Sequence, residues 1–81
     1  MNRAEALESV RASVLSAVPG ADVTGVTPDQ NLREAFELDS LDFLGFVEAL
    51  GERTGCSVAE DDYAGLATLS DWADLLVART G

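Results

Sequence analysis

The sequence predicts an all-α protein, a small four-helix bundle with a long first loop and a short third helix. Apolar residues recur three and four positions apart in separate stretches, which is the spacing of helices that bury one face. No stretch reads convincingly as a strand. The 81 residues suffice for one domain with its own core, so we expect a single domain over 1–81.

The first predicted helix covers residues 2–18 and ends at Pro19-Gly20, because neither residue favours its continuation. Its apolar stripe consists of Leu7, Val10, Val14 and Val18. Residues 21–37 show no sustained period, and Gly25, Pro28 and Asn31 interrupt them. We therefore expect a long ordered loop with a helical turn near 32–36, packed through Val23, Val26, Leu32 and Phe36.

The second predicted helix runs from Ser40 to Thr54 and ends at Gly55. Its inward stripe is expected to consist of Phe46, Val47, Leu50 and Thr54. Another face of the same helix would carry Leu41, Gly45, Glu48 and Glu52.

An acidic cluster at 60–62 favours the positive end of a helix dipole, so it predicts a short third helix of one or two turns. Ser70 is the expected N-cap of the last helix. The apolar residues of that helix should face inward; they are Trp72, Ala73, Leu75 and Leu76.

The charge is strongly negative: fifteen acids stand against five arginines, with no lysine or histidine, giving −10. Such a surface repels nucleic acid and anionic membranes and attracts partners with basic patches. No apolar run approaches the roughly 20 residues needed to span a bilayer, and the start lacks the apolar stretch of a signal peptide. We expect a cytoplasmic protein.

The residues of an independent catalyst are missing from the sequence. It has no histidine base, no Schiff-base lysine and no Gly-rich phosphate loop, and the single cysteine, Cys56, has no neighbouring cation to activate it. Asp39 and Asp42 suit a helix N-terminus and a solvated face better than a catalytic carboxylate pair. A zinc site would lack ligands, and no stretch matches a calcium-binding EF-hand loop.

The stretch Asp39-Ser40-Leu41-Asp42 lies where an irregular acidic segment meets the second helix. Asp39 or Ser40 can cap that helix, and capping alone would explain either residue. The stretch also resembles the attachment motif of the acyl carrier proteins, whose serine hydroxyl is esterified with 4'-phosphopantetheine. The order of the predicted elements and the downstream runs 58–61 and 66–69 are similar to that family from end to end.

The resemblance implies a carrier rather than an enzyme, with 4'-phosphopantetheine on Ser40. A phosphopantetheinyl transferase would load it, and acyl-loading and acyl-processing enzymes with basic patches would then bind the protein, which we expect to act as a monomer. The implied partner-docking residues are Asp39, Leu41, Asp42, Glu48 and Glu52. Two alternatives remain open: a peptidyl or aminoacyl carrier of nonribosomal assembly, and an unmodified acidic helical adaptor.

The chain departs from the family pattern at several positions. Glu37 stands where a glycine is common, although a left-handed backbone is unfavourable for glutamate. Gly45 and Gly51 stand where acids are common. Phe43 and Trp72 stand where the family commonly has smaller side chains, so we expect the interior to be nearly full and a long acyl chain to stay outside it. The alternative is that these two rings compensate for the glycines and simply complete the core.

Overall fold

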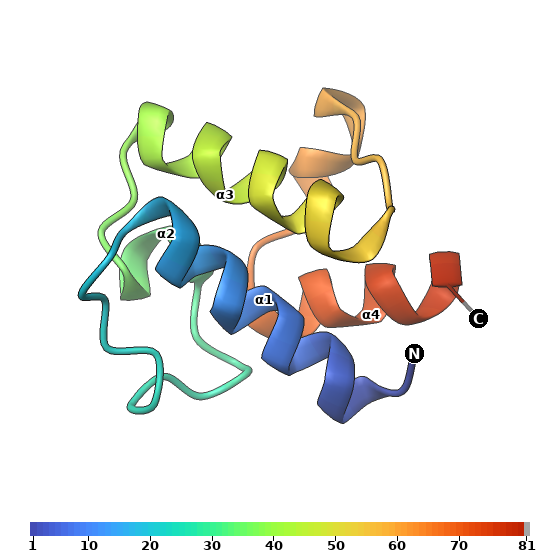
Figure 1. Cartoon of the computed structure of the whole chain (residues 1–81), viewed down its shortest axis with the longest axis horizontal. Helices are drawn as coiled ribbons and strands as arrows, with labels where there is room; N and C mark the ends of the chain where they lie inside the picture. Colours follow the sequence, from blue (N-terminus) through green and yellow to red (C-terminus); the bar gives the residue numbers. More distant parts are fainter. Residues whose placement is uncertain (81) are drawn as a thin grey trace.

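The computed structural model describes residues 1–80 and shows helices joined by ordered loops (Figure 1). The elements are α1 (Arg3–Ala17), α2 (Leu32–Ala35), α3 (Ser40–Thr54), the 3-10 helix η1 (Glu60–Gly65) and α4 (Leu69–Thr80). No strand forms within these 80 residues, where the one isolated bridge pairs Asn31 with Thr68. The predicted all-α bundle is confirmed, with α2 as the expected turn in the long loop and η1 as the short third helix.

Local capping explains where the first long helices begin and end. The Asn2 side chain accepts a hydrogen bond from the Glu5 backbone N–H at 2.8 Å, and the Glu5 carboxylate accepts one from the Asn2 N–H at 3.0 Å. This reciprocal pair starts α1 one residue later than predicted. Gly55 ends α3 in the left-handed conformation at φ 74°, as its position in the sequence predicts.

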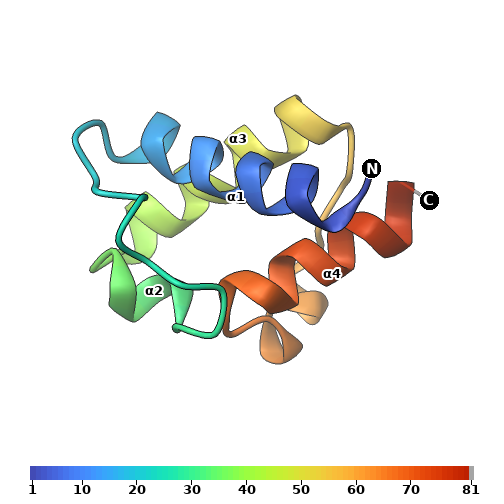
Figure 2. The same cartoon turned by 90° about the horizontal axis from the view of Figure 1, so that it is seen from below.

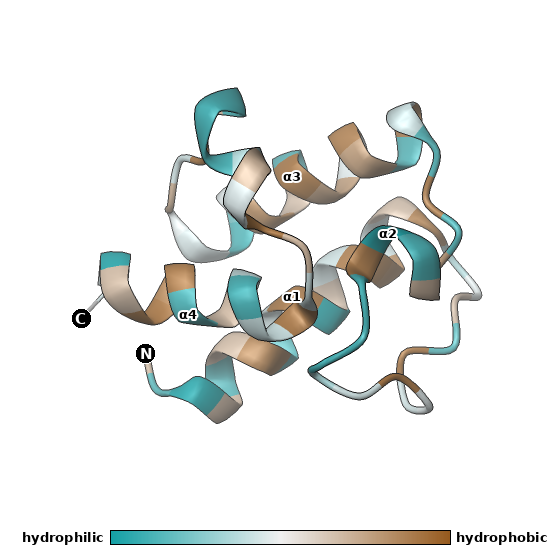
Figure 3. Ribbon diagram, turned by 180° about the vertical axis from the view of Figure 1, so that it is seen from behind, coloured by the Kyte–Doolittle hydropathy of each residue, from teal (hydrophilic) through white to brown (hydrophobic). Residues whose placement is uncertain are grey.

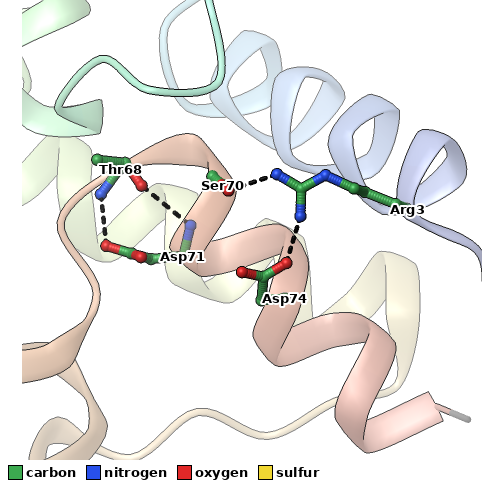
Figure 4. A network of polar contacts seen from close by, with 5 residues as sticks. All are labelled: Arg3, Thr68, Ser70, Asp71 and Asp74. Carbon is green, nitrogen blue, oxygen red and sulfur yellow. Dashed lines mark hydrogen bonds and ion pairs between the residues drawn. The ribbon is translucent and has the colours of Figure 1, made fainter.

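The prediction that Ser70 caps the last helix is wrong, because α4 already begins at Leu69. The cap is Thr68, whose hydroxyl accepts from the Asp71 N–H at 3.1 Å, while the Asp71 carboxylate accepts from the Thr68 N–H at 3.0 Å (Figure 4). Thr68 has an acid three residues ahead to complete this pair, whereas the third residue after Ser70 is Ala73. The Ser70 hydroxyl instead accepts from the Arg3 guanidinium, which also pairs with Asp74 and so joins α1 to α4 (Figure 4).

The core forms where α1 packs against both α3 and α4. The buried apolar residues are Ala6, Val10, Val14, Leu32, Leu38, Phe43, Phe46, Leu50, Cys56, Leu69, Trp72, Ala73 and Leu76. Three predicted stripes are only partly correct, because five of their residues are half-buried: Leu7, Val18, Val47, Thr54 and Leu75. Contact with two partner helices moves the buried face of α1 toward Ala6 and Ser13, and α3 buries Phe43 at its first turn.

The long loop is ordered and tied to the rest of the molecule. Its backbone runs beside the start of α4 (Figure 2), where the Leu32 N–H donates to the Ala67 carbonyl at 2.9 Å and the Ser70 N–H to the Pro28 carbonyl at 2.8 Å. Arg11 of α1 donates to the Val26 carbonyl at 3.2 Å. The apolar residues predicted to anchor the loop do pack on the core, with Leu32 buried. The loop therefore holds the approach to α3 in a fixed position.

Among the helices described, none is both long and apolar enough to cross a membrane.

Candidate functional site

The first turn of α3 presents Ser40 at the surface. Asp39 is the N-cap, and its carboxylate accepts a hydrogen bond from the Asp42 N–H at 2.8 Å. Capping is thus done by the residue before the serine, and within residues 1–80 the Ser40 hydroxyl has no hydrogen-bond partner. Ser40 is exposed as the first residue of a 15-residue helix, so its backbone is held by the helix while its hydroxyl is accessible for reaction.

The segment before Ser40 is a tight helix ending. Phe36 caps α2, the Glu37 N–H donates to the Glu34 carbonyl at 3.3 Å, and the Leu38 N–H donates to the Arg33 carbonyl at 2.9 Å. These two bonds form a Schellman motif, which requires a left-handed residue at the position of Glu37. Glu37 adopts that conformation with φ 51°, although it is not a glycine. The turn directs Leu38 into the core, where only 7% of its surface is exposed, and so fixes the start of α3.

The structure brings most of the predicted docking residues together. Leu41, Glu48 and Glu52 lie along one exposed side of α3, at helical spacing from one another. Asp39 is exposed and Asp42 half-buried at the head of the helix beside Ser40. The side chain of Leu41 is 77% exposed, whereas Leu50 of the same helix is fully buried.

Leu44 also lies at the exposed surface of α3, and it was not among the docking residues that the sequence predicted. It is 52% exposed and lies one turn beyond Ser40. Its place three residues after Leu41, outside the inward stripe, was the available signal. Leu41 and Leu44 together make an apolar ridge beside the serine, and Figure 3 shows the hydrophilic start of α3 giving way to hydrophobic turns.

The two glycines of α3 lie close to neighbouring backbone or side chains. A Cβ at Gly51 would come within 3.3 Å of the Cys56 carbonyl oxygen, and a Cβ at Gly45 within 3.5 Å of the Ala17 Cβ. The first approach is tight for a side chain, whereas the second is ordinary contact. The lack of acids at these positions leaves Glu48 and Glu52 as the acidic residues of this side of α3.

Hydrogen bonds lower the pKa of four carboxyl groups, all of them outside α3. The Thr24 hydroxyl lowers the pKa of Asp22, the Thr27 hydroxyl that of Asp29, and Arg79 that of Asp62. The Thr68 backbone N–H is the main cause of the lowered pKa of Asp71. These carboxylates hold loops and helix ends.

Residues 10–76 match the family described as the phosphopantetheine attachment site. The chain belongs to this family. It is 29% identical over 77 residues to the acyl carrier protein of Rubrobacter xylanophilus, an alignment that covers 95% of this chain and 94% of that one. The acyl carrier protein of Thermosynechococcus vestitus is 32% identical over 76 residues, with 94% and 93% covered. That of Saccharopolyspora erythraea is 33% identical over 82 residues, with 98% and 85% covered.

Membership of this family makes the protein a carrier of covalently attached 4'-phosphopantetheine and not an enzyme. The chemistry of transfer then belongs to the prosthetic group and to the enzymes that bind the carrier. The protein has to supply an accessible hydroxyl on a stable scaffold. The exposed Ser40 hydroxyl, which no other group in residues 1–80 engages, fits this requirement.

Proposed function

We propose that Ser40 is the attachment residue and that the protein carries acyl groups as thioesters for fatty acid, polyketide or related biosynthesis. The observation that supports this best is the division of roles at the head of α3. Asp39 caps the helix, and the hydroxyl of Ser40 remains exposed and free. A serine that served only as a cap would have its oxygen on a backbone N–H.

Loading is a phosphoryl transfer in which the chain supplies the nucleophile. The Ser40 oxygen attacks the diphosphate of coenzyme A, an O–P bond forms, the P–O bond within the diphosphate breaks, and adenosine bisphosphate leaves. The hydroxyl proton goes to a base on the transferase. The thiol of the attached group then holds the acyl cargo as a thioester.

Partner enzymes would bind the exposed side of α3. The acids Asp39, Asp42, Glu48 and Glu52 attract basic patches and orient the encounter, because charge at an interface mainly affects association rate and register. Leu41, and the newly recognised Leu44, offer apolar surface that a partner can bury. The net charge of −10 extends the same attraction over a longer range.

The test is modification by coenzyme A and a broad-specificity phosphopantetheinyl transferase, followed by intact mass measurement. Wild type should gain one phosphopantetheine unit, and Ser40→Ala should gain none. Ser57→Ala is a matched control, since Ser57 is also exposed and, among residues 1–80, only its backbone carbonyl is engaged, by Arg79. It should be modified like wild type. No gain in wild type would support an unmodified adaptor, and a gain in Ser40→Ala would place the attachment elsewhere.

A further inference from the structure

Four of the five aromatic side chains form one cluster where α3, η1 and α4 meet. Phe43 contacts Tyr63 edge-on with ring centroids 5.2 Å apart, and Phe46 contacts Trp72 edge-on at 5.0 Å. Phe43 also lies 5.9 Å from Trp72, so the rings form a continuous group. We call Phe43, Phe46, Tyr63 and Trp72 the ring cluster. These spacings are those of well-packed aromatic pairs, so little space remains between the rings.

The ring cluster is closed on its outer side by a cation. The Arg33 guanidinium carbon of α2 lies 4.4 Å from the centroid of Phe43, within the range of a cation–π interaction. Phe43 follows Ser40 by three residues and therefore lies on a neighbouring part of the same helix face. Only 7% of Phe43 is exposed. The part of the interior nearest to Ser40 is thus filled by a ring and covered by Arg33.

This arrangement bears on the cargo because a long acyl chain is strongly apolar. Such a chain gains from leaving water, and the interior between helices is where a bundle could shelter it. Here Phe46 and Trp72 are fully buried, and a chain could enter only by displacing rings from a close-packed core. Three hollows described on the surface, of about 350, 460 and 270 Å³, are lined by residues outside the ring cluster.

We propose that the ring cluster keeps the acyl group outside the bundle whatever its length, and that Phe43 is the residue that closes the interior. The inference rests on the proposed function, since it concerns the cargo of the arm on Ser40. Phe43 is the member of the cluster nearest to Ser40 in the chain, and it contacts both Tyr63 and Trp72 as well as Arg33. Its removal should open space at the start of α3.

The experiment modifies wild type, Phe43→Ala and Leu44→Ala with the transferase and acetyl-, hexanoyl- or dodecanoyl-coenzyme A, and confirms each product by intact mass. Thermal unfolding then gives Tm for each acyl length. Trp72, the single tryptophan, reports independently on the interior through its fluorescence. Leu44→Ala is the matched control, because Leu44 follows Phe43 in the sequence but is exposed. This variant tests whether the acyl chain lies instead against the exposed Leu41 and Leu44.

In wild type and Leu44→Ala, Tm should differ between acetyl and dodecanoyl forms by less than about 2 °C, and Trp72 emission should not change. The acetyl form of Phe43→Ala should have a lower Tm than acetyl wild type. Its dodecanoyl form should have a Tm more than about 4 °C above that of its acetyl form, because the acyl chain fills the opened space. Should Phe43→Ala fail to fold, Tyr63→Ala opens the same edge contact, because Tyr63 is the half-buried ring that η1 packs against Phe43.

A rise of Tm with acyl length in wild type, together with a shift of Trp72 emission, would overturn the inference. A Tm that does not change with acyl length in any folded variant of the ring cluster would also overturn it. Neither result would affect the attachment proposal, which fails separately if mass measurement shows no loading at Ser40.

Discussion

Glu37 offers the sharpest test of how the approach to Ser40 is built. It occupies the left-handed position of the Schellman motif that ends α2, with φ 51°, and its side chain is exposed. The perturbation is Glu37→Gly, which relieves the backbone without removing any hydrogen bond of the Glu37 side chain seen in residues 1–80. The N–H bonds of Glu37 and Leu38 remain available to the variant.

The magnitude follows from two opposing terms. A left-handed backbone costs an L-residue about 1–2 kcal/mol, because its Cβ approaches the following carbonyl oxygen. Glycine avoids this cost but loses about 0.5–1 kcal/mol more conformational entropy on folding. The free energy of unfolding should therefore rise by about 0.5–1 kcal/mol. For a domain of this size that corresponds to an increase in Tm of about 2–8 °C.

The assay is urea or thermal unfolding of wild type, Glu37→Gly and Glu37→Gln. Glu37→Gln is the control for charge, because removing one of fifteen acids also relieves repulsion. The glutamine keeps a Cβ on the left-handed residue, so its backbone strain is unchanged. Glu34→Gly should instead lower the free energy of unfolding, because Glu34 lies inside α2, where glycine costs about 1 kcal/mol. The expected order of stability is Glu37→Gly, then Glu37→Gln, then Glu34→Gly.

The reasoning would be refuted by a Glu37→Gly variant no more stable than Glu37→Gln. That result would mean that the gain comes from charge alone and that the left-handed backbone carries no strain.

Two further predictions concern charge. Modification by the transferase should slow as salt rises, because ions screen the acidic field over about 8 Å at physiological strength. The double variant Asp39→Asn with Asp42→Asn should show a weaker salt dependence, while the asparagine at 39 still caps α3. A modification rate that does not change with salt in wild type would contradict electrostatic steering. Asp71→Ala should lower the free energy of unfolding by about 1 kcal/mol at neutral pH through loss of the cap. The pKa of Asp71 is lowered in the folded state, so its stabilisation is present above the unfolded pKa and is lost as pH falls below about 4, where the variant and wild type should converge.

The sequence by itself determined the features that depend on neighbours in the chain. The bounds of α3 were predictable because an acidic cap stands immediately before Ser40 and a left-handed glycine immediately after Thr54. The motif around Ser40, the charge of −10 and the periodic apolar residues then indicated the family and the helical bundle. The same reasoning left open whether Asp39 or Ser40 would cap α3.

Only the tertiary structure decided features that depend on residues distant in the chain. Glu37 holds a left-handed backbone because the burial of Leu38 and the fixed loop outweigh the local cost. The Ser70 hydroxyl accepts from Arg3, which lies 67 residues away in the chain, whereas the Thr68–Asp71 pair that caps α4 is local and was readable from the sequence. The filled interior required Phe43, Tyr63 and Trp72 to meet from three elements. Local hydrogen bonds can be read from adjacent residues, whereas packing is fixed when distant helices compete for the same space.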